Sequence, residues 1–162
     1  MGLAQKSLAY IEPEDYLRME EFSSEKHEYL DGVIYAWQGQ TVRGMAGESI
    51  DHNRIMRNIG ASLHAQAAPL GCEVFMADVR LRPFKNSAYF YPDVMVRCGP
   101  TASGEATEIS DAALVVEVLS NTTEGFDRQD KFDRYRCMTS LQCYVLVSPM
   151  LRTIEVFRAD QG

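Results

Sequence analysis

The segment that most constrains the fold is an apolar run with a single acidic residue inside it. Residues 113–120 read ALVVEVLS. A strand that is apolar at successive positions, and not only at every second one, is buried on both faces, so it needs a layer of structure on each side of its sheet. The run therefore predicts a central strand covered by helices, and it places Glu117 in the interior.

The pattern of apolar residues and turn signals predicts the other helices and strands of the fold. Asp31-Gly32 lies between two β-prone runs and predicts a hairpin with a type I′ turn. Segments 39–47 and 99–110 are polar, and the second is expected to be a solvated loop. We predict an α/β fold, an α+β mixed sheet flanked by helices, with an N-terminal helix and β-hairpin, in one domain over residues 1–162. Helices are expected at 13–21, 49–68 and from 120–124 to about 138, and strands at 72–82, 89–98, 113–120, 142–148 and 152–158.

Composition excludes several classes of protein. The 162 residues include 16 Lys and Arg against 23 Asp and Glu, a formal net charge of −7, which excludes a charge-driven nucleic-acid coat or membrane-surface protein. No apolar stretch reaches about 18 residues, so no membrane span is expected. The N-terminal sequence MGLAQKSLAYIEPEDY has no secretory pattern. The four cysteines form no C-x-x-C pair, which argues against a zinc ribbon and predicts reduced thiols in a cytoplasmic protein.

Glu117 is the residue that periodicity does not explain. An ionised carboxylate buried there costs several kcal/mol unless it is paired or coordinates a cation. Two interpretations remain open: a glutamate paired with one Arg or Lys, and a metal ligand or an acid with a raised pKa. Asp93 follows Pro92 at the mouth of another strand. If the two strands are neighbours, their carboxylates could form a Mg²⁺ site; alternatively, Pro-Asp simply makes a turn.

A cation follows in the next helix. Asp127, Lys131 and Tyr135 are spaced i, i+4, i+8 and share one helical face. One interpretation is a solvated Asp–Lys pair. The other is a cation directed over the edge of the sheet, able to orient a water molecule or stabilise charge on a phosphate.

These motifs together resemble a known family. The order of YPDVMV (91–96), LVVEVLS (114–120) and the Asp127, Lys131, Tyr135 face is similar to that of the Uma2 family, formerly a domain of unknown function. Its members are proposed endonucleases of the PD-(D/E)XK, restriction endonuclease-like superfamily. The resemblance spans residues 16–157, nearly the whole chain, because KHEYLDG (26–32), SIDHN (49–53) and FMADVR (75–80) also look like that family.

The resemblance implies a catalytic set. The superfamily's PD falls on Pro92-Asp93 and its acid on Glu117. Its usual lysine would fall on Leu119, so Lys131 corresponds to the variants in which this lysine has moved to the following helix. Mg²⁺ or Mn²⁺ held by Asp93 and Glu117 would then activate water for hydrolysis of a nucleic-acid phosphodiester, with DNA as the expected substrate and Lys131 positioning the water or stabilising charge.

Four further residues are accessory candidates. Glu28 is either an additional acid near the metal or an exposed strand residue. His52 either reaches the site from its helix or has a structural role. Asp78, in an alternating pattern with two arginines, belongs to a solvated salt-bridge face or to a phosphate-contacting one. Asp127 shares its helical face with Lys131.

Two rival functions remain open. One is a binding or assembly domain that keeps the nuclease fold without activity, and the other is a carboxylate-pair hydrolase acting on sugars, which would need neither Lys131 nor a metal. A homodimer is expected by analogy with restriction enzymes. Residues 120–123 read SNTT where the family more often has SPST, and the chain ends soon after RTIEVFR, where relatives continue, which predicts an exposed sheet edge.

Overall fold

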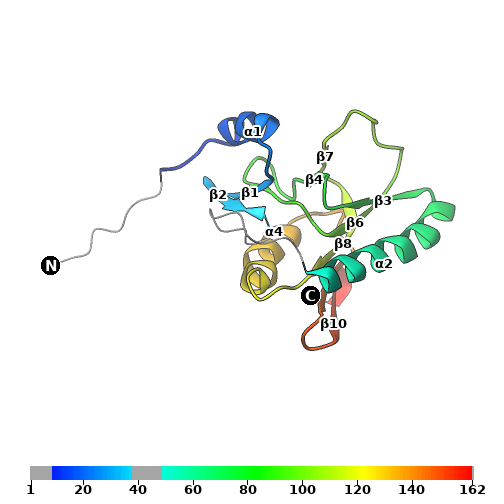
Figure 1. The fold of residues 1–162 in the computed structure, drawn as a ribbon. Helices are drawn as coiled ribbons and strands as arrows, with labels where there is room; N and C mark the ends of the chain where they lie inside the picture. Colours follow the sequence, from blue (N-terminus) through cyan, green and yellow to red (C-terminus); the bar gives the residue numbers. More distant parts are fainter. Residues whose placement is uncertain (1–8, 38–48, 162) are drawn as a thin grey trace.

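The computed structural model describes residues 9–37 and 49–161 and shows a mixed α/β architecture (Figure 1). The expected segment 39–47 lies outside the described residues. The main sheet has the strand order β10-β9-β8-β6-β3, in which β8 and β9 are parallel and the other neighbours antiparallel. β8 is the central strand, as the apolar run predicts. The strands are β3 (Cys72–Met76), β6 (Val94–Cys98), β8 (Ala112–Val118), β9 (Cys143–Ser148) and β10 (Thr153–Arg158).

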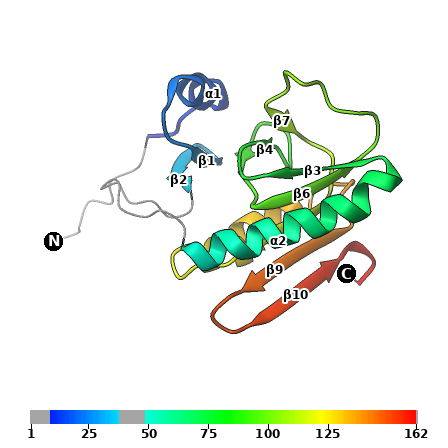
Figure 2. The ribbon, with the colours of Figure 1, turned by 45° about the vertical axis from the view of Figure 1, so that its right-hand side comes forward.

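Helical layers cover both faces of β8. Val116 and Val118 pack with Met56 of α2 (Ile50–Ala67) on one face. Val115, which points the other way, packs in the cluster that contains Tyr135 from the helical segment after β8. Figure 2 shows α2 lying across the sheet, with that second helical segment behind it. By strand alternation, Glu117 points toward the same side as Val115.

The helix α2 follows from its sequence. The Ser49 side chain accepts a hydrogen bond from the His52 N–H at 3.1 Å, which caps the first turn. Ile55, Ile59 and Leu63 form the apolar stripe that packs on the sheet. The helix leads into a short 3₁₀ turn, η2 (Ala68–Leu70), which ends at a left-handed glycine. The prediction of a helix over 49–68 is confirmed.

The connection from β8 to β9 is helical but not uniformly α-helical. It consists of α3 (Glu124–Phe126), a π-helical turn η3 (Asp127–Lys131) and α4 (Phe132–Tyr135). A π-helical turn is wider than an α-helical turn and is frequently found at functional sites. Periodicity predicted the helix, but it does not distinguish these two kinds of turn.

A second sheet lies beside the first, in the order β2-β1-β5. Asp31 and Gly32 both have positive φ, 46° and 87°, which confirms the type I′ hairpin. Tyr16, Tyr29 and Tyr89 form a small aromatic core there, with ring centroids 5.0–5.9 Å apart. Its elements are α1 (Pro13–Phe22), β1 (His27–Leu30), β2 (Val33–Ala36) and β5 (Ala88–Tyr89).

The prediction of one strand over 72–82 was wrong. β3 ends at Met76, and Ala77 takes a left-handed conformation with φ of 49°. The chain resumes as β4 (Arg80–Leu81), which pairs in parallel with β7 (Glu108–Ile109), so the expected loop 99–110 also contains a short strand. The alternation of apolar and polar residues continues through the break, which is why the pattern suggested a single strand.

The prediction that all the cysteines are reduced was also wrong. Cys72 and Cys98 occupy paired positions on β3 and β6, with Cα atoms 4.2 Å apart, and form a disulfide. Cys137 and Cys143 are free. The two bonded cysteines are 26 positions apart. That separation reveals nothing until the register of the two strands is known.

β10 forms one edge of the main sheet. β10 pairs with β9, and Ile154 on it is 68% exposed. A short 3₁₀ turn, η4 (Ala159–Gln161), follows. Within the described residues, no helix is both long enough and apolar enough to cross a bilayer.

Candidate active site

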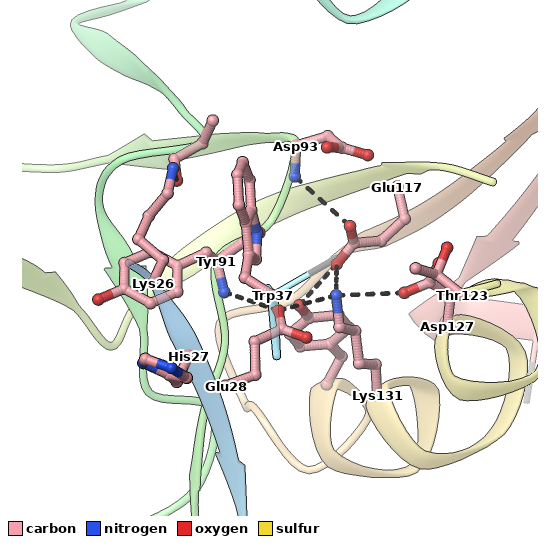
Figure 3. A network of polar contacts seen from close by, with 12 residues as sticks. Lys26, His27, Glu28, Trp37, Tyr91, Asp93, Glu117, Thr123, Asp127 and Lys131 are labelled. Carbon is pink, nitrogen blue, oxygen red and sulfur yellow. Dashed lines mark hydrogen bonds and ion pairs between the residues drawn. The ribbon is translucent and has the colours of Figure 1, made fainter. Parts of the chain in front are cut away.

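Glu117 lies at the centre of a buried polar network (Figure 3). Its Oε1 atom accepts hydrogen bonds from the Tyr135 hydroxyl at 2.8 Å and from the Lys131 ammonium at 3.2 Å. Its Oε2 atom lies 3.4 Å from the backbone N–H of Asp93, which donates to it. Glu117 is therefore paired with a lysine, as one interpretation of the sequence required, but this lysine has other acidic partners.

Lys131 is surrounded by three carboxylates. Its Nζ atom lies 3.0 Å from Glu28, 3.2 Å from Glu117 and 3.1 Å from Asp127, and Figure 3 shows the amino group between them. The side chain is only about 5% exposed. The interpretation of a solvated Asp–Lys pair is therefore wrong. The cation is directed into the fold, toward the end of the central strand.

Asp93 joins this network at the mouth of β6, because β6 and β8 are neighbours. Its Oδ2 atom accepts a hydrogen bond from the Val118 N–H at 2.6 Å and lies 3.3 Å from His52 Nε2. The same His52 nitrogen is 2.8 Å from the Val118 carbonyl oxygen. Because a carbonyl only accepts, Nε2 carries the proton, and His52 reaches the site from α2.

Glu28 enters from the second sheet. It is 2% exposed, so the interpretation of an exposed strand residue is wrong. Its Oε1 atom accepts a hydrogen bond from the Tyr91 N–H and forms the ion pair with Lys131, both at 3.0 Å. Nothing in its local sequence indicated this partner, because the contact depends on how the two sheets pack.

Asp78 lies apart from the network. Its side chain is 86% exposed in the break between β3 and β4 and pairs with Lys26 at 2.8 Å. Arg82 pairs instead with Glu108 at 2.7 Å. Asp78 and Arg82 therefore do not share the charged face that an unbroken strand over 72–82 would have given them.

The network opens into a pocket of about 280 Å³. The loop after β8 forms much of its wall, and carboxylates from two strands and one helix face it. Lys131 lies among these carboxylates, and Glu28 lies behind the lysine. The pocket is lined by Ser49, His52, Tyr91, Asp93, residues 117–123, Asp127, Lys131, Pro149 and Met150.

Burial shifts the protonation of the network. Burial raises the pKa of Glu117 well above its ordinary range, and the neighbouring acids raise it further, while Lys131 opposes this. Burial also raises the pKa of Glu28, again against the effect of Lys131. The pKa of Lys131 itself is raised: burial lowers it, but Asp127, Glu117 and Glu28 together outweigh that effect.

The charges in the network do not balance when all of its acids are ionised. The network holds one lysine and four buried carboxylates, of which Glu28, Glu117 and Asp127 contact the lysine and Asp93 does not. Carboxylate oxygens are the ligands that Mg²⁺ prefers, so the chemistry of the donors fits a hard divalent cation. Within the described residues, no group of three or more His, Cys, Asp or Glu side chains has an arrangement that could hold a metal ion. At the centre of the carboxylates, the positive charge is supplied by Lys131.

Replacing Glu117 by Gln is expected to flatten the pH dependence of stability. The folded protein retains a proton on Glu117 that the unfolded chain loses near the ordinary pKa of 4.5. Stability therefore falls as the pH rises between these two pKa values, by up to about 1.4 kcal/mol per pH unit for such a group. Glu28 has a shift of the same sign and remains in the variant, so part of the slope persists. Urea unfolding from about pH 5 to about pH 8 measures this slope. An unchanged slope in Glu117→Gln would contradict the expectation.

The Uma2 family model, described as "Putative restriction endonuclease", matches residues 13–162. Two uncharacterized proteins from Synechocystis sp. are similar to the chain. The first, slr1290, is 36% identical over 153 residues, covering 94% of this chain and 76% of its own length. The second, sll1609, is 32% identical over 146 residues, covering 89% of this chain and 78% of its own.

A solved structure has a similar fold. It is a crystal structure from Anabaena variabilis described as "a putative nuclease belonging to DUF820". It matches with a TM-score of 0.67 at 18% identity, covering 94% of this chain and 82% of that one. At that identity the likeness is evidence of a common fold.

Proposed function

The chain belongs to the Uma2 family of restriction endonuclease-like proteins, and on this premise we propose that it is a Mg²⁺- or Mn²⁺-dependent endonuclease acting on DNA. The observation that carries the proposal is a group of four buried carboxylates beside a pocket, three of which contact the one buried lysine, Lys131. Such an excess of acids costs stability unless protons or a cation neutralise it. A site that needs a cation and opens to solvent suits a metal-dependent hydrolase.

Asp93 and Glu117 are the residues proposed to hold the metal. They come from adjacent strands, and both carboxylates line the pocket. A bound divalent cation would lower the pKa of a coordinated water and neutralise charge on the phosphate. The Val118 N–H holds Asp93, and the Tyr135 hydroxyl holds Glu117, so both ligands are oriented before substrate arrives.

Lys131 is proposed to act on the phosphate or on the attacking water. Its amino group lies 3.2 Å from the proposed metal ligand Glu117, so it is close to any phosphate oxygen bound there. A fixed cation in a largely buried site stabilises developing negative charge more strongly than it would in water. The π-helical turn carries this lysine, which takes the role that a strand lysine has elsewhere in the superfamily.

Two broader proposals accompany this one. The chain forms one domain over residues 1–162, and it works as a homodimer. The dimer suits the substrate, because the two strands of a duplex are related by two-fold symmetry. Sedimentation of the protein alone and with a DNA duplex measures the stoichiometry directly.

One observation favours a second candidate, a nucleic-acid-binding domain without catalysis. Lys131 already supplies a positive charge among Glu28, Glu117 and Asp127. If no divalent cation competes with it, the fold would be retained and the chemistry lost. Metal titration separates the candidates, because only the nuclease requires a cation at Asp93 and Glu117.

The decisive experiment is a cleavage assay on the full chain. Supercoiled plasmid, single-stranded DNA and RNA are incubated with Mg²⁺ or Mn²⁺, and EDTA samples serve as controls. Nicked or linear DNA that forms only with metal is expected. No cleavage of any of these substrates with either metal would overturn the proposal.

A further inference from the structure

A groove of about 660 Å³ lies beside the carboxylate pocket. Its charged side chains are mainly cationic, whereas those of the pocket are mainly acidic. Among the described residues that line the groove, the cationic side chains are Lys26, Arg54 and Arg57, and the one carboxylate is that of Asp78. The chain as a whole carries a formal net charge of −7, so this cationic surface is a local exception. The lining consists of Lys26, Trp37, Ile50, Asn53, Arg54, Met56, Arg57, Ala77 and Asp78.

We propose that this groove binds the DNA backbone next to the bond to be cleaved, with Arg54 and Arg57 contacting phosphates. The inference rests on the proposed function and names the surface that holds its substrate. Charge complementarity is its first support, because phosphates are bound through Lys and Arg and sequence-independent affinity depends on such contacts.

The placement of the two arginines supports the same conclusion. Arg54 and Arg57 are exposed and lie about 4.5 Å apart along the axis of α2. Arg54 has an exposed partner, Asp51, at 3.0 Å, and such a pair contributes little and is easily exchanged. Among the described residues, Arg57 has no carboxylate within 4.0 Å. Both guanidinium groups can therefore reach a phosphate at small cost.

Contacts within the protein hold Lys26 against the ring of Trp37, the aromatic side chain of the groove. Lys26 Nζ lies 3.5 Å from the centroid of the Trp37 ring and is held by the Ala77 carbonyl at 3.0 Å and by Asp78 at 2.8 Å. This contact fixes a cation against an indole face, an arrangement with ordered positive charge and little side-chain freedom left to lose. The left-handed Ala77 turns the chain so that its carbonyl meets Lys26.

Residues that line the groove are neighbours of residues that line the carboxylate pocket. His52 lines the pocket, and the next residue, Asn53, lines the groove. On the other side, the Trp37 indole N–H donates to the Tyr91 carbonyl at 3.1 Å, and Tyr91 lines the pocket. Figure 3 shows Lys26, Trp37 and Tyr91 next to Asp93 and Glu117. A DNA strand whose scissile phosphate lies in the pocket would therefore place its neighbouring phosphates over α2.

The test compares wild type with the double variant Arg54→Gln/Arg57→Gln. Binding of a fluorescein-labelled DNA duplex of about 20 base pairs is measured by anisotropy in Ca²⁺ at several salt concentrations, and cleavage is measured in Mg²⁺. We expect a Kd about ten-fold higher and a salt slope lower by about 1.8, because two phosphate contacts are lost. KM should rise while kcat stays within about two-fold, because the lost contacts hold substrate and transition state equally.

The matched control is Arg18→Gln/Arg136→Gln. These arginines are also exposed, and each has a carboxylate partner three residues away, Asp15 and Asp133, as Arg54 has in Asp51. The control changes the net charge by the same amount, and its affinity should stay within about two-fold of wild type. Equal losses in both double variants would overturn the inference, because they would reflect net charge and not the groove.

Trp37 provides an independent readout, because it is the only tryptophan in the sequence. Duplex binding should change its emission in wild type, with the same midpoint as the anisotropy. Binding without any change in emission would overturn the inference.

If wild type cleaves DNA but the groove variant binds and cleaves normally, the inference fails and the proposed function stands. If wild type neither binds nor cleaves, both fail; if it binds through the groove without cleaving, only the catalytic proposal fails.

Discussion

Glu117→Gln and Asp93→Asn are each expected to slow metal-dependent cleavage of DNA by about 1,000-fold, a loss of about 4 kcal/mol of transition-state stabilisation. Each change replaces a carboxylate proposed to hold the metal by an amide of nearly the same shape. Both residues are only 3% exposed and hydrogen-bonded, so the amide keeps the packing and loses the charge. The expected result is therefore a folded protein with a defective metal site.

Two measurements separate this outcome from unfolding. Calorimetric titration with Mn²⁺ should show binding to wild type and at least about ten-fold weaker binding to both variants. Asp133→Asn is the control, because it makes the same carboxylate-to-amide change at a site in α4 where the side chain is 70% exposed. It should cleave at the wild-type rate. Full activity in Glu117→Gln would remove Glu117 from the proposed mechanism.

Lys131→Met is expected to lower the free energy of unfolding by about 3–5 kcal/mol in metal-free buffer. The substitution leaves Glu28, Glu117 and Asp127 buried together without the cation that contacts all three. The methionine fills much of the same volume, so the loss reports charge more than packing. Lys85→Met, at an exposed position, should stay within about 0.5 kcal/mol of wild type.

The same variant should regain stability when a divalent cation is added. A ligand that binds only the folded state at 100 times its Kd stabilises it by about 2.7 kcal/mol. Lys131→Arg keeps the charge and is expected to be intermediate in stability, which gives a measurable variant even if the methionine form folds poorly. Stability of Lys131→Met equal to wild type, or a complete lack of response of both variants to Mg²⁺ and Mn²⁺, would contradict this account.

The central part of the site could be predicted from the sequence because its elements are consecutive. The apolar run around Glu117 identifies a buried strand, and the helix that follows such a strand packs back onto its sheet, which brings Lys131 near Glu117. Asp93 was expected beside them only if its strand was a neighbour, and the β6–β8 pairing satisfies that condition. Residues on elements that follow one another in the chain, or that pair in a sheet, can therefore be placed near each other from the sequence.

The remaining contacts depend on distant segments, which local patterns do not describe. Glu28 reaches Lys131 across 103 positions of sequence, through the packing of a separate sheet. Cys72 and Cys98 meet only because β3 and β6 pair in one register. Ala77 breaks a strand whose alternation continues unchanged, since a single left-handed residue leaves no trace in hydropathy. Tyr135 was placed on the correct helical face, but its hydrogen bond to Glu117 was not predicted.

The ion pair between Glu28 and Lys131 has a consequence for how the chain folds. Glu28 belongs to the hairpin sheet, and Lys131 follows the central strand of the main sheet, so the candidate active site is also a joint between the two sheets. A shortened chain that begins after the hairpin would lose Glu28, one of the three carboxylates that contact Lys131. Local opening of the hairpin would likewise expose Lys131 and alter the site before the main sheet unfolds. The geometry of the candidate site and the packing of the hairpin sheet on the main sheet therefore depend on each other.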